Sequence, residues 1–282
     1  MSDLLLHPIT KQHIEAYTAQ PSHAVLISAP AGAGKYTVAQ YIASQLLGLE
    51  PATLINHPYA KVLTPDEGKA LTIEQIRELN GFLSRRVPGS KRRVIIIDAA
   101  HTMTDEAQNA LLKTLEEPPE GTYLLLTSSA EHALLPTIQS RVTKLTLQRP
   151  ASDEALQYFI EKGFSNQQIQ QALLMSGGWP GIIHALLHQD QNHPMFTAVA
   201  EARRLIQATQ FERLAMVDTL AKDKDLSLRM LTVLQQMSHV ALLQGRTPAT
   251  WRRVLTAAYA ATEELLRNGQ PKLVLTNLML SL

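Results

Sequence analysis

SAPAGAGKYT, residues 28–37, is the stretch that decides the fold of this 282-residue chain. A short apolar run at residues 24–27 precedes it, and a helical pattern extends from Lys35 to about Leu47. A strand, a glycine-rich loop and a helix in this order form a P-loop, in which loop amides and the helix N-terminus hold phosphate oxygens while the lysine neutralises them. The residues predicted to bind phosphate are Gly32, Ala33, Gly34, Lys35, Tyr36 and Thr37.

Two positions of this loop depart from the usual pattern. Ala29 stands where the first glycine is expected, and Tyr36 stands where a small hydroxyl residue holds Mg²⁺. A phenol with an ordinary pKa of about 10 is a poor magnesium ligand while it is protonated. Thr37 is displaced by one residue, which is about 100° around a helix of 3.6 residues per turn. The sequence leaves open whether ATP with Mg²⁺ binds here.

The amino-acid composition excludes several classes of protein and several kinds of site. Lys and Arg number 26 against 25 Asp and Glu, so the chain lacks the basic excess of a free-standing nucleic-acid binder. The absence of cysteine excludes disulfides, thiolate zinc sites and cysteine nucleophiles. Neither a signal peptide nor a membrane-spanning apolar stretch is apparent. We therefore expect a cytoplasmic protein that has no zinc and no membrane partner.

Polar residues follow two further apolar runs. Asp98 ends the run at residues 94–97, and Ser128 and Ser129 follow the run at 122–127. Such runs are typical of parallel strands buried on both faces. An acid at the end of such a strand, downstream of a P-loop, commonly holds the nucleotide's Mg²⁺ through water. Asp98 is therefore a candidate for that role, with a purely structural strand-end acid as the alternative.

Other segments give weaker signals. Residues 49–70 contain several proline and glycine breakers and are predicted to be irregular. A basic patch around residues 88–89 is either a solvated loop or a contact to nucleic acid or to an acidic partner. The patch comprises Arg85, Arg86, Lys91, Arg92 and Arg93.

The pattern of apolar residues changes after Pro150, where strand-like runs stop and helical patterns begin. Strands alternating with helices, followed by helices alone, predict a three-layer α/β domain and then helical domains. We assign residues 1–148 to the P-loop nucleotide-binding domain, 149–190 to a small helical domain and 191–282 to a second helical domain. The apolar segment 271–282 should pack into a helical bundle or a subunit interface.

Several motifs together resemble one family. These are the P-loop, TIEQIREL at residues 72–79, Asp98, AQNALLKTLEEPP at 107–119 and LPTIQSR at 135–141. In this order the motifs resemble the AAA+ subunits of bacterial DNA polymerase III clamp loaders, most strongly over residues 20–147. The resemblance implies an AAA+ domain, a helical lid at 149–190 and a helical collar for oligomerisation at 191–282.

The family implies a five-membered ring that uses ATP to open a sliding clamp and load it on primed DNA. Its partners would be gamma/tau-type and delta-type subunits. Nucleotides sit between neighbours, and one subunit supplies an arginine to the site of the next. Arg141 matches that trans-acting arginine, and Ser128 with Ser129 matches the sensor of the γ-phosphate. A planar guanidinium suits this role because it can pair with two phosphate oxygens.

The departures from the family pattern are similar to those of delta-prime subunits. Ala99 stands where active members have the water-activating glutamate, and His101 comes too late to replace it unless the strand end is distorted. The second-sensor arginine is missing from the segment beginning at Trp179. We therefore expect a largely non-hydrolysing subunit that completes a neighbour's site. The alternatives are an active gamma/tau-like ATPase and another AAA+ protein of DNA repair or phage DNA metabolism.

Overall fold

The computed structural model describes residues 4–66, 69–84, 87, 92–193, 195–245 and 247–282. Its contacts divide the chain into two compact units. One is Leu6–Gln148, and the other is Arg149–Leu282 together with the start of the chain up to Leu5. Each unit is described by itself below.

The first unit is built on a parallel sheet of five strands in the order β2-β3-β4-β1-β5. The strands are β1 Ala24–Ser28, β2 Ala60–Leu63, β3 Arg93–Ile97, β4 Thr122–Ser128 and β5 Thr143–Thr146. β1 lies between β4 and β5, with Ser28 level with Ser128 and with Thr146. The loops that follow β1, β3 and β4 therefore meet at one edge of the sheet, where open α/β sheets bind ligands.

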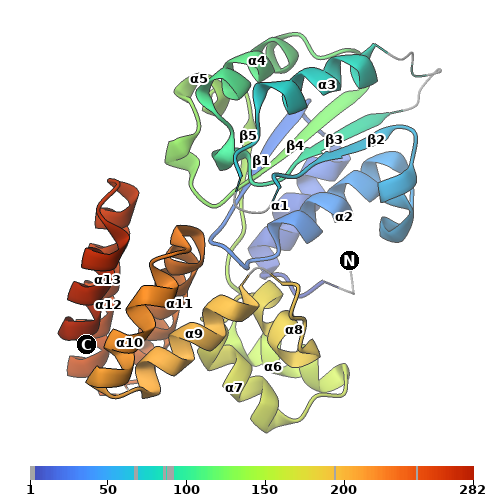
Figure 1. Ribbon diagram of the computed structural model, residues 1–282. Helices are drawn as coiled ribbons and strands as arrows, with labels where there is room; N and C mark the ends of the chain where they lie inside the picture. Colours follow the sequence, from blue (N-terminus) through green and yellow to red (C-terminus); the bar gives the residue numbers. More distant parts are fainter. Residues whose placement is uncertain (1–3, 67–68, 85–86, 88–91, 194, 246) are drawn as a thin grey trace. The chain divides into compact units, whose positions relative to one another are not determined.

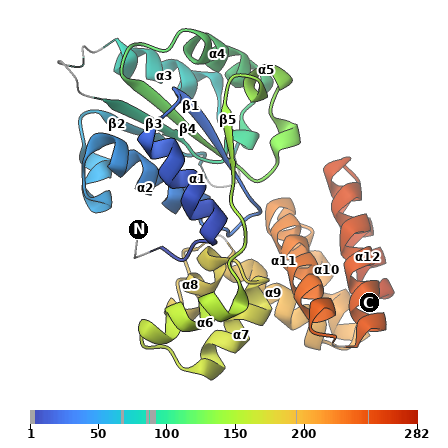
Figure 2. The same cartoon turned by 180° about the vertical axis from the view of Figure 1, so that it is seen from behind.

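Helices cover both faces of this sheet (Figures 1 and 2). α1 (Pro8–Ala19) and α2 (Lys35–Leu47) lie on one face, and α3 (Ile73–Leu83), α4 (Asp105–Glu116) and the short α5 (Pro136–Gln139) lie on the other. Buried strand residues such as Leu26, Ile95 and Leu124 form one core cluster with Leu79 and Leu111 of α3 and α4. The predicted three-layer α/β fold is confirmed.

The segment predicted to be irregular contains an edge strand. β2 lies within residues 49–70 and follows a 3-10 helix, Pro51–Asn56. β2 is only four residues long and is half-exposed over three of them, and among the described residues it pairs with β3 alone. So short an edge strand leaves almost no periodic signal among the prolines that surround it, which is why the sequence did not reveal it.

Arg93 is not part of a solvated patch, as its neighbours in sequence suggested. It begins β3 and is buried, with 3% of its surface exposed. Its guanidinium donates to the carbonyls of Phe82 and Leu83 at the end of α3, at 2.7 and 2.9 Å, and to Thr122 Oγ1 at 3.2 Å. Burial lowers its pKa. Arg93 thus satisfies carbonyls that a helix end leaves unpaired. Of the rest of the patch, Arg85, Arg86 and Lys91 lie outside the described residues.

The second unit consists of helices throughout its described length. They are α6 Ser152–Glu161, α7 Asn166–Ser176, α8 Pro180–His188, α9 Phe196–Gln207, α10 Gln210–Leu220, α11 Lys224–Leu243, α12 Pro248–Leu266 and α13 Pro271–Ser281. Phe159, Ile169 and Ile183 form the core of α6–α8. α13 buries Val274, Leu275, Leu278 and Met279 while packing against α10 and α12. The further division of this unit into a lid and a collar stays a prediction.

No helix in the described part of the chain is long and apolar enough to span a membrane.

Candidate functional site

The loop between β1 and α2 has the backbone of a phosphate cradle. Gly32 and Gly34 have φ values of 77° and 86°, which only glycine adopts readily. Gly34 is the N-cap of α2, and no side chain caps the first turn of that helix. The first amides of α2 are thus free of a capping side chain and directed at the place an anion would occupy. Thr37 is exposed in this first turn.

Ala29, the first departure from the loop pattern, is accommodated without strain. It does not have a positive φ, and its amide donates to the carbonyl of Ser128 at 3.3 Å. Ala33 is buried and its amide donates to the Pro30 carbonyl, also at 3.3 Å. The backbone of the loop therefore tolerates alanine where the sequence pattern prefers glycine.

Lys35 turns into the protein. Its Nζ donates to the carbonyls of Ala29 and Pro30 and to Ser129 Oγ, each at 2.9 Å. An ammonium group has three N–H donors, and all of them are engaged in these contacts. To reach a phosphate, Lys35 would have to exchange one of its internal bonds. The lysine here joins the phosphate loop to the end of β4.

Burial lowers the pKa of Lys35 to about 8, although the nearby Asp98 acts in the opposite direction. Between that value and the ordinary 10.5, the unfolded chain binds more protons than the folded chain, so stability must rise with pH. Below about pH 8 both states are protonated and the contribution is constant. The tyrosines Tyr17 and Tyr36, whose pKa values burial raises, oppose the trend once the pH passes about 10.

We expect the wild-type chain to gain up to about 1.4 kcal/mol per pH unit from Lys35 between pH 8 and 10, relative to a Lys35→Met variant. Urea unfolding of both proteins, followed by circular dichroism across this range, measures the difference. Parallel pH profiles for the two proteins would mean that Lys35 keeps its ordinary pKa.

Asp98 lies beside the loop, as predicted, and is fixed by a neighbouring strand. Thr127 Oγ1 donates to Asp98 Oδ1 at 2.5 Å and accepts from the amide of Ala99 at 2.9 Å. The charge of Asp98 acts on both Lys35 and Tyr36. Thr127 was not singled out from the sequence, although it begins the hydroxyl run that ends β4. Asp98 thus lies close enough to the phosphate loop for its charge to act there, and its role in holding magnesium stays a prediction.

Ala99 follows Asp98 directly and adopts a left-handed conformation, with φ 49° and ψ 44°. The chain turns sharply there into a 3-10 helix, Ala100–Thr102. This turn brings His101 back, so that its Nδ1 accepts from the Ser129 amide at 3.4 Å. The left-handed turn at an alanine carries no sequence signal, so this contact was not foreseen; that His101 does not replace the glutamate stays a prediction.

The two serines have different environments. Ser128 is fully buried, and its Oγ accepts from the Ala130 amide at 3.1 Å, which completes a local turn. Ser129 is the one that contacts Lys35. Of the predicted γ-phosphate sensor pair, the structure therefore brings only the Ser129 side chain to the phosphate loop.

Tyr36 is half-buried at the start of α2. Burial raises the pKa of its phenol, and the charge of Asp98 raises it further. The phenol therefore stays protonated at neutral pH, and a neutral hydroxyl of this size does not replace the small hydroxyl that binds Mg²⁺. Among the described residues, no group of three or more His, Cys, Asp or Glu side chains could hold a metal ion.

Arg141 follows α5 and precedes the start of β5, which is level with Val25, whereas the cradle follows Ser28 at the other end of β1. Its guanidinium pairs with Glu116 Oε1 at 2.8 Å and donates to the Thr137 carbonyl at 2.9 Å and to Ser140 Oγ at 3.2 Å. About a third of the side chain, 35%, remains exposed. The guanidinium of Arg141 thus has a fixed orientation at the surface, and part of it is accessible to another molecule. Glu116 was not singled out from the sequence, although it belongs to the motif at residues 107–119.

Gln108, on the same helix as Glu116, connects that helix to the segment leading to Arg141. It is buried, and its Nε2 donates to the carbonyls of Met103 and Ala133 at 3.3 and 3.1 Å. Its Oε1 accepts from the Leu135 amide at 2.7 Å. A buried amide with both ends satisfied fixes its neighbours firmly. The position of Arg141 is therefore set by α4 through both Gln108 and Glu116.

Comparisons with known proteins agree on one family. The family model described as "DNA polymerase III, delta subunit" matches residues 8–151. "DNA polymerase III subunit delta'" of Pseudomonas aeruginosa is 35% identical over 179 residues, which cover 57% of this chain and 55% of that protein. The protein of the same name from Escherichia coli is 31% identical over 202 residues, covering 66% and 60%. The chain therefore spans little more than half the length of these curated relatives.

A solved structure supports the fold. The gamma subunit-related protein of DNA polymerase III from Thermotoga maritima superposes with a TM-score of 0.52 at 18% identity, over 96% of this chain and 97% of that one. At that identity the likeness concerns the fold alone. The match of the family model over residues 8–151 shows that the chain belongs to the DNA polymerase III delta subunit family, and the relatives named above are delta' subunits.

Proposed function

We propose that the chain is a delta'-type clamp-loader subunit that scarcely hydrolyses ATP and completes a neighbour's ATP site with Arg141. The observation that carries this proposal is a contrast within one domain. The phosphate loop keeps its backbone while the groups for magnesium and water activation are replaced, and Arg141 is fixed at the surface away from that loop. The ring would contain gamma/tau-type and delta-type subunits and would load a sliding clamp on primed DNA.

The case against hydrolysis rests on three replaced groups. Ala99 has no carboxylate to polarise water, Tyr36 is a neutral phenol, and no arginine stands in the segment at Trp179 that begins α8. Loss of a general base by itself lowers a rate by about 10²–10⁴-fold. The engagement of all three Lys35 donors adds a further cost to any phosphate contact.

The cradle nevertheless fits a phosphate group better than it fits magnesium. Its glycines and the uncapped start of α2 would contact phosphate oxygens through backbone amides. When bound, ATP would supply a γ-phosphate to this edge of the sheet, and Asp98 is the residue to hold a magnesium-bound water. Nothing at position 36 would coordinate the metal directly. Binding of ATP should therefore be weak and nearly independent of Mg²⁺.

Isothermal titration of the purified chain with ATP checks this expectation. We expect affinities in Mg²⁺ and in EDTA that agree within about twofold, because the magnesium hydroxyl is missing. Tyr36→Thr, which restores that hydroxyl, should make the affinity magnesium-dependent. Tight binding by the unaltered chain that EDTA abolishes would contradict the proposal.

Assembly tests the function as a whole. The chain, mixed with the gamma/tau-type and delta-type subunits of its own organism, should elute as one complex and support clamp loading on primed DNA. An active gamma/tau-like ATPase would instead turn over ATP by itself. Another AAA+ protein, of DNA repair or phage DNA metabolism, would fail to join the complex.

A further inference from the structure

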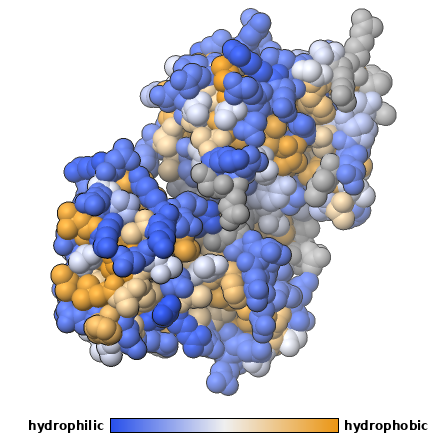
Figure 3. Space-filling model, in the orientation of Figure 1, coloured by the Kyte–Doolittle hydropathy of each residue, from blue (hydrophilic) through white to orange (hydrophobic). Residues whose placement is uncertain are grey.

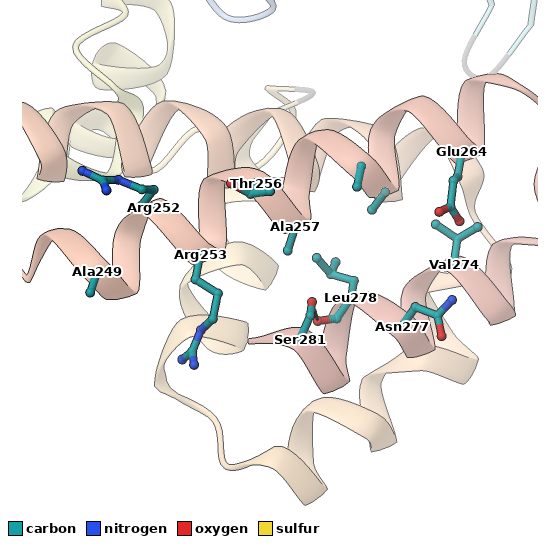
Figure 4. A pocket seen from close by; sticks show the side chains of 12 residues that line it. Ala249, Arg252, Arg253, Thr256, Ala257, Glu264, Val274, Asn277, Leu278 and Ser281 are labelled. Carbon is teal, nitrogen blue, oxygen red and sulfur yellow. Dashed lines mark hydrogen bonds between the residues drawn. The ribbon is translucent and has the colours of Figure 1, made fainter.

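Among the described residues, most of the large exposed apolar side chains belong to the second unit. Figure 3 shows hydrophobic side chains gathered on its C-terminal helices, where Leu273 and Leu280 are more than half exposed. A groove of about 600 Å³ between α12 and α13 is lined in part by Val274 and Leu278 (Figure 4). The segment around Arg141, in the first unit, instead holds polar side chains that are bonded to one another.

Lys144 of β5 joins two parts of this polar segment. Its Nζ donates to Glu131 Oε2 at 3.0 Å and to Gln139 Oε1 at 3.1 Å. The Nε2 of Gln139 donates in turn to the carbonyls of Glu131 and Leu134, each at 3.0 Å. Glu131, Gln139 and Lys144 thus form a closed ring of hydrogen bonds, the Lys144 ring. Within it the amide of Gln139 is engaged at both its oxygen and its nitrogen, so the side chain has one defined orientation.

The Lys144 ring is joined to the sheet at two points. Lys144 lies in β5 and is level with Leu26 of β1. The side chain of Ser28, at the end of β1, is hydrogen-bonded to the Glu131 carboxylate. This bond and the one from Lys144 hold the pKa of Glu131 below its ordinary value, so the carboxylate is charged at neutral pH and pairs with the lysine. The ring is therefore fixed to the rigid part of the domain.

Arg141 depends on the short helix that the Lys144 ring holds. Gln139 is the last residue of α5, and only Ser140 separates it from Arg141. Arg141 is bonded to the same helix, because its amide donates to the Ile138 carbonyl and its guanidinium to the Thr137 carbonyl, both at 2.9 Å. A helix of four residues has little stability of its own. Contacts at the end of α5 therefore decide where the guanidinium points.

We infer that the three residues of the Lys144 ring are positioning residues for Arg141, because they fix α5 so that the guanidinium keeps its direction. Glu116 holds the guanidinium from α4, and the ring holds the helix from which it extends. A group that is fixed beforehand need not be ordered at the moment of reaction, and this lowers the barrier. The inference rests on the proposed function, since the direction of Arg141 matters to the chemistry only if it reaches a neighbour's phosphate.

Lys144→Met tests the ring without unfolding the domain. The side chains of Lys144 and Glu131 are 46% and 33% exposed, and ion pairs of this kind add little to stability. The substitution removes both bonds from Nζ and keeps most of the apolar stem. In the reconstituted complex on primed DNA, we expect the single-turnover rate at the neighbouring site to fall about tenfold at saturating ATP, short of the roughly 10²-fold that a displacement of about 1 Å can cost. The ATP concentration that gives half of this rate should change less than about twofold, since the neighbour's own loop would bind the nucleotide.

Three further variants distinguish positioning from a general disturbance. Lys144→Arg keeps a cation that can donate to both acceptors, so it should recover most of the rate. Gln139→Leu breaks the same ring at another residue and should slow the reaction as Lys144→Met does. The two combined should cost little more than either by itself, because each already opens the ring. Lys11→Met, at an exposed lysine of α1, is the matched control and should leave the rate within about twofold of the unaltered chain.

The outcomes separate the ring from the proposed function. If Arg141→Ala slows the reaction while Lys144→Met and Gln139→Leu leave it unchanged, the positioning role is overturned and the proposed function stands. If Arg141→Ala has no effect either, both are overturned. Light scattering of each complex and urea unfolding of each variant accompany the kinetics. A slower reaction that comes with a smaller complex or an unfolded chain, or that Lys144→Arg does not recover, would assign the effect to assembly or folding and would overturn the positioning role.

Discussion

Arg141→Ala is expected to slow ATP hydrolysis at the neighbouring subunit's site by about 10³-fold, the lower end of what a trans arginine contributes to phosphoryl transfer. The guanidinium is fixed by Glu116, the Thr137 carbonyl and Ser140, and it keeps an exposed edge. It would neutralise charge that develops on the γ-phosphate in the transition state. Single-turnover hydrolysis by the reconstituted complex on primed DNA measures the effect, since the other sites continue to turn over.

Two further variants separate charge from geometry. Arg141→Lys keeps the charge but loses the planar fork, so it should recover little of the rate. Glu116→Gln leaves the guanidinium in place but loosens it, so the rate should fall less than with Arg141→Ala. In the double variant, Glu116→Gln should cause no loss of rate beyond that of Arg141→Ala. Arg203→Ala, an exposed arginine on α9, serves as the matched control. Unchanged single-turnover kinetics with Arg141→Ala would end the arginine-finger proposal.

The second large effect concerns the chain in isolation. Purified without partners, the chain should hydrolyse ATP about 10²–10⁴-fold more slowly than an active subunit of its family, because Ala99 supplies no general base. Released phosphate, measured at saturating ATP with Mg²⁺, gives the rate.

The Lys35→Met variant shows whether any residual turnover belongs to this site: we expect its rate to match that of the unaltered chain, which would assign the residual turnover to a contaminating ATPase. Steady turnover that this variant abolishes would favour the active gamma/tau-like alternative. Such a result would also mean that Lys35 releases its contacts with Ala29, Pro30 and Ser129 when ATP binds.

The parts of the fold that the sequence predicted are those with strong local signals. The runs that became β1, β3 and β4 are buried on both faces and uniformly apolar, so they stand out from their surroundings. The glycines of the cradle and Asp98 follow such runs directly, and the parallel order brings their ends together. The local sequence pattern and the strand order thus both place the cradle glycines and Asp98 at this edge of the sheet.

The parts that the sequence did not predict depend on contacts between distant residues. Arg93 resembled its basic neighbours, yet it is buried against carbonyls at the end of α3. Glu116 and Arg141 are 25 positions apart, and only the packing of α4 against α5 makes them partners. Lys35 has the usual residue type for its position, and nothing local reveals that its three donors are already engaged.

One comparison tests the central claim, that this chain contributes to a neighbour's site and not to its own. The single-turnover rate of the reconstituted complex is measured with Arg141→Ala and, separately, with Lys35→Met, after confirming by light scattering that both complexes are intact. We predict a loss of about 10³-fold at one site with Arg141→Ala and a rate within about twofold of the wild type with Lys35→Met. A loss with Lys35→Met and none with Arg141→Ala would contradict it.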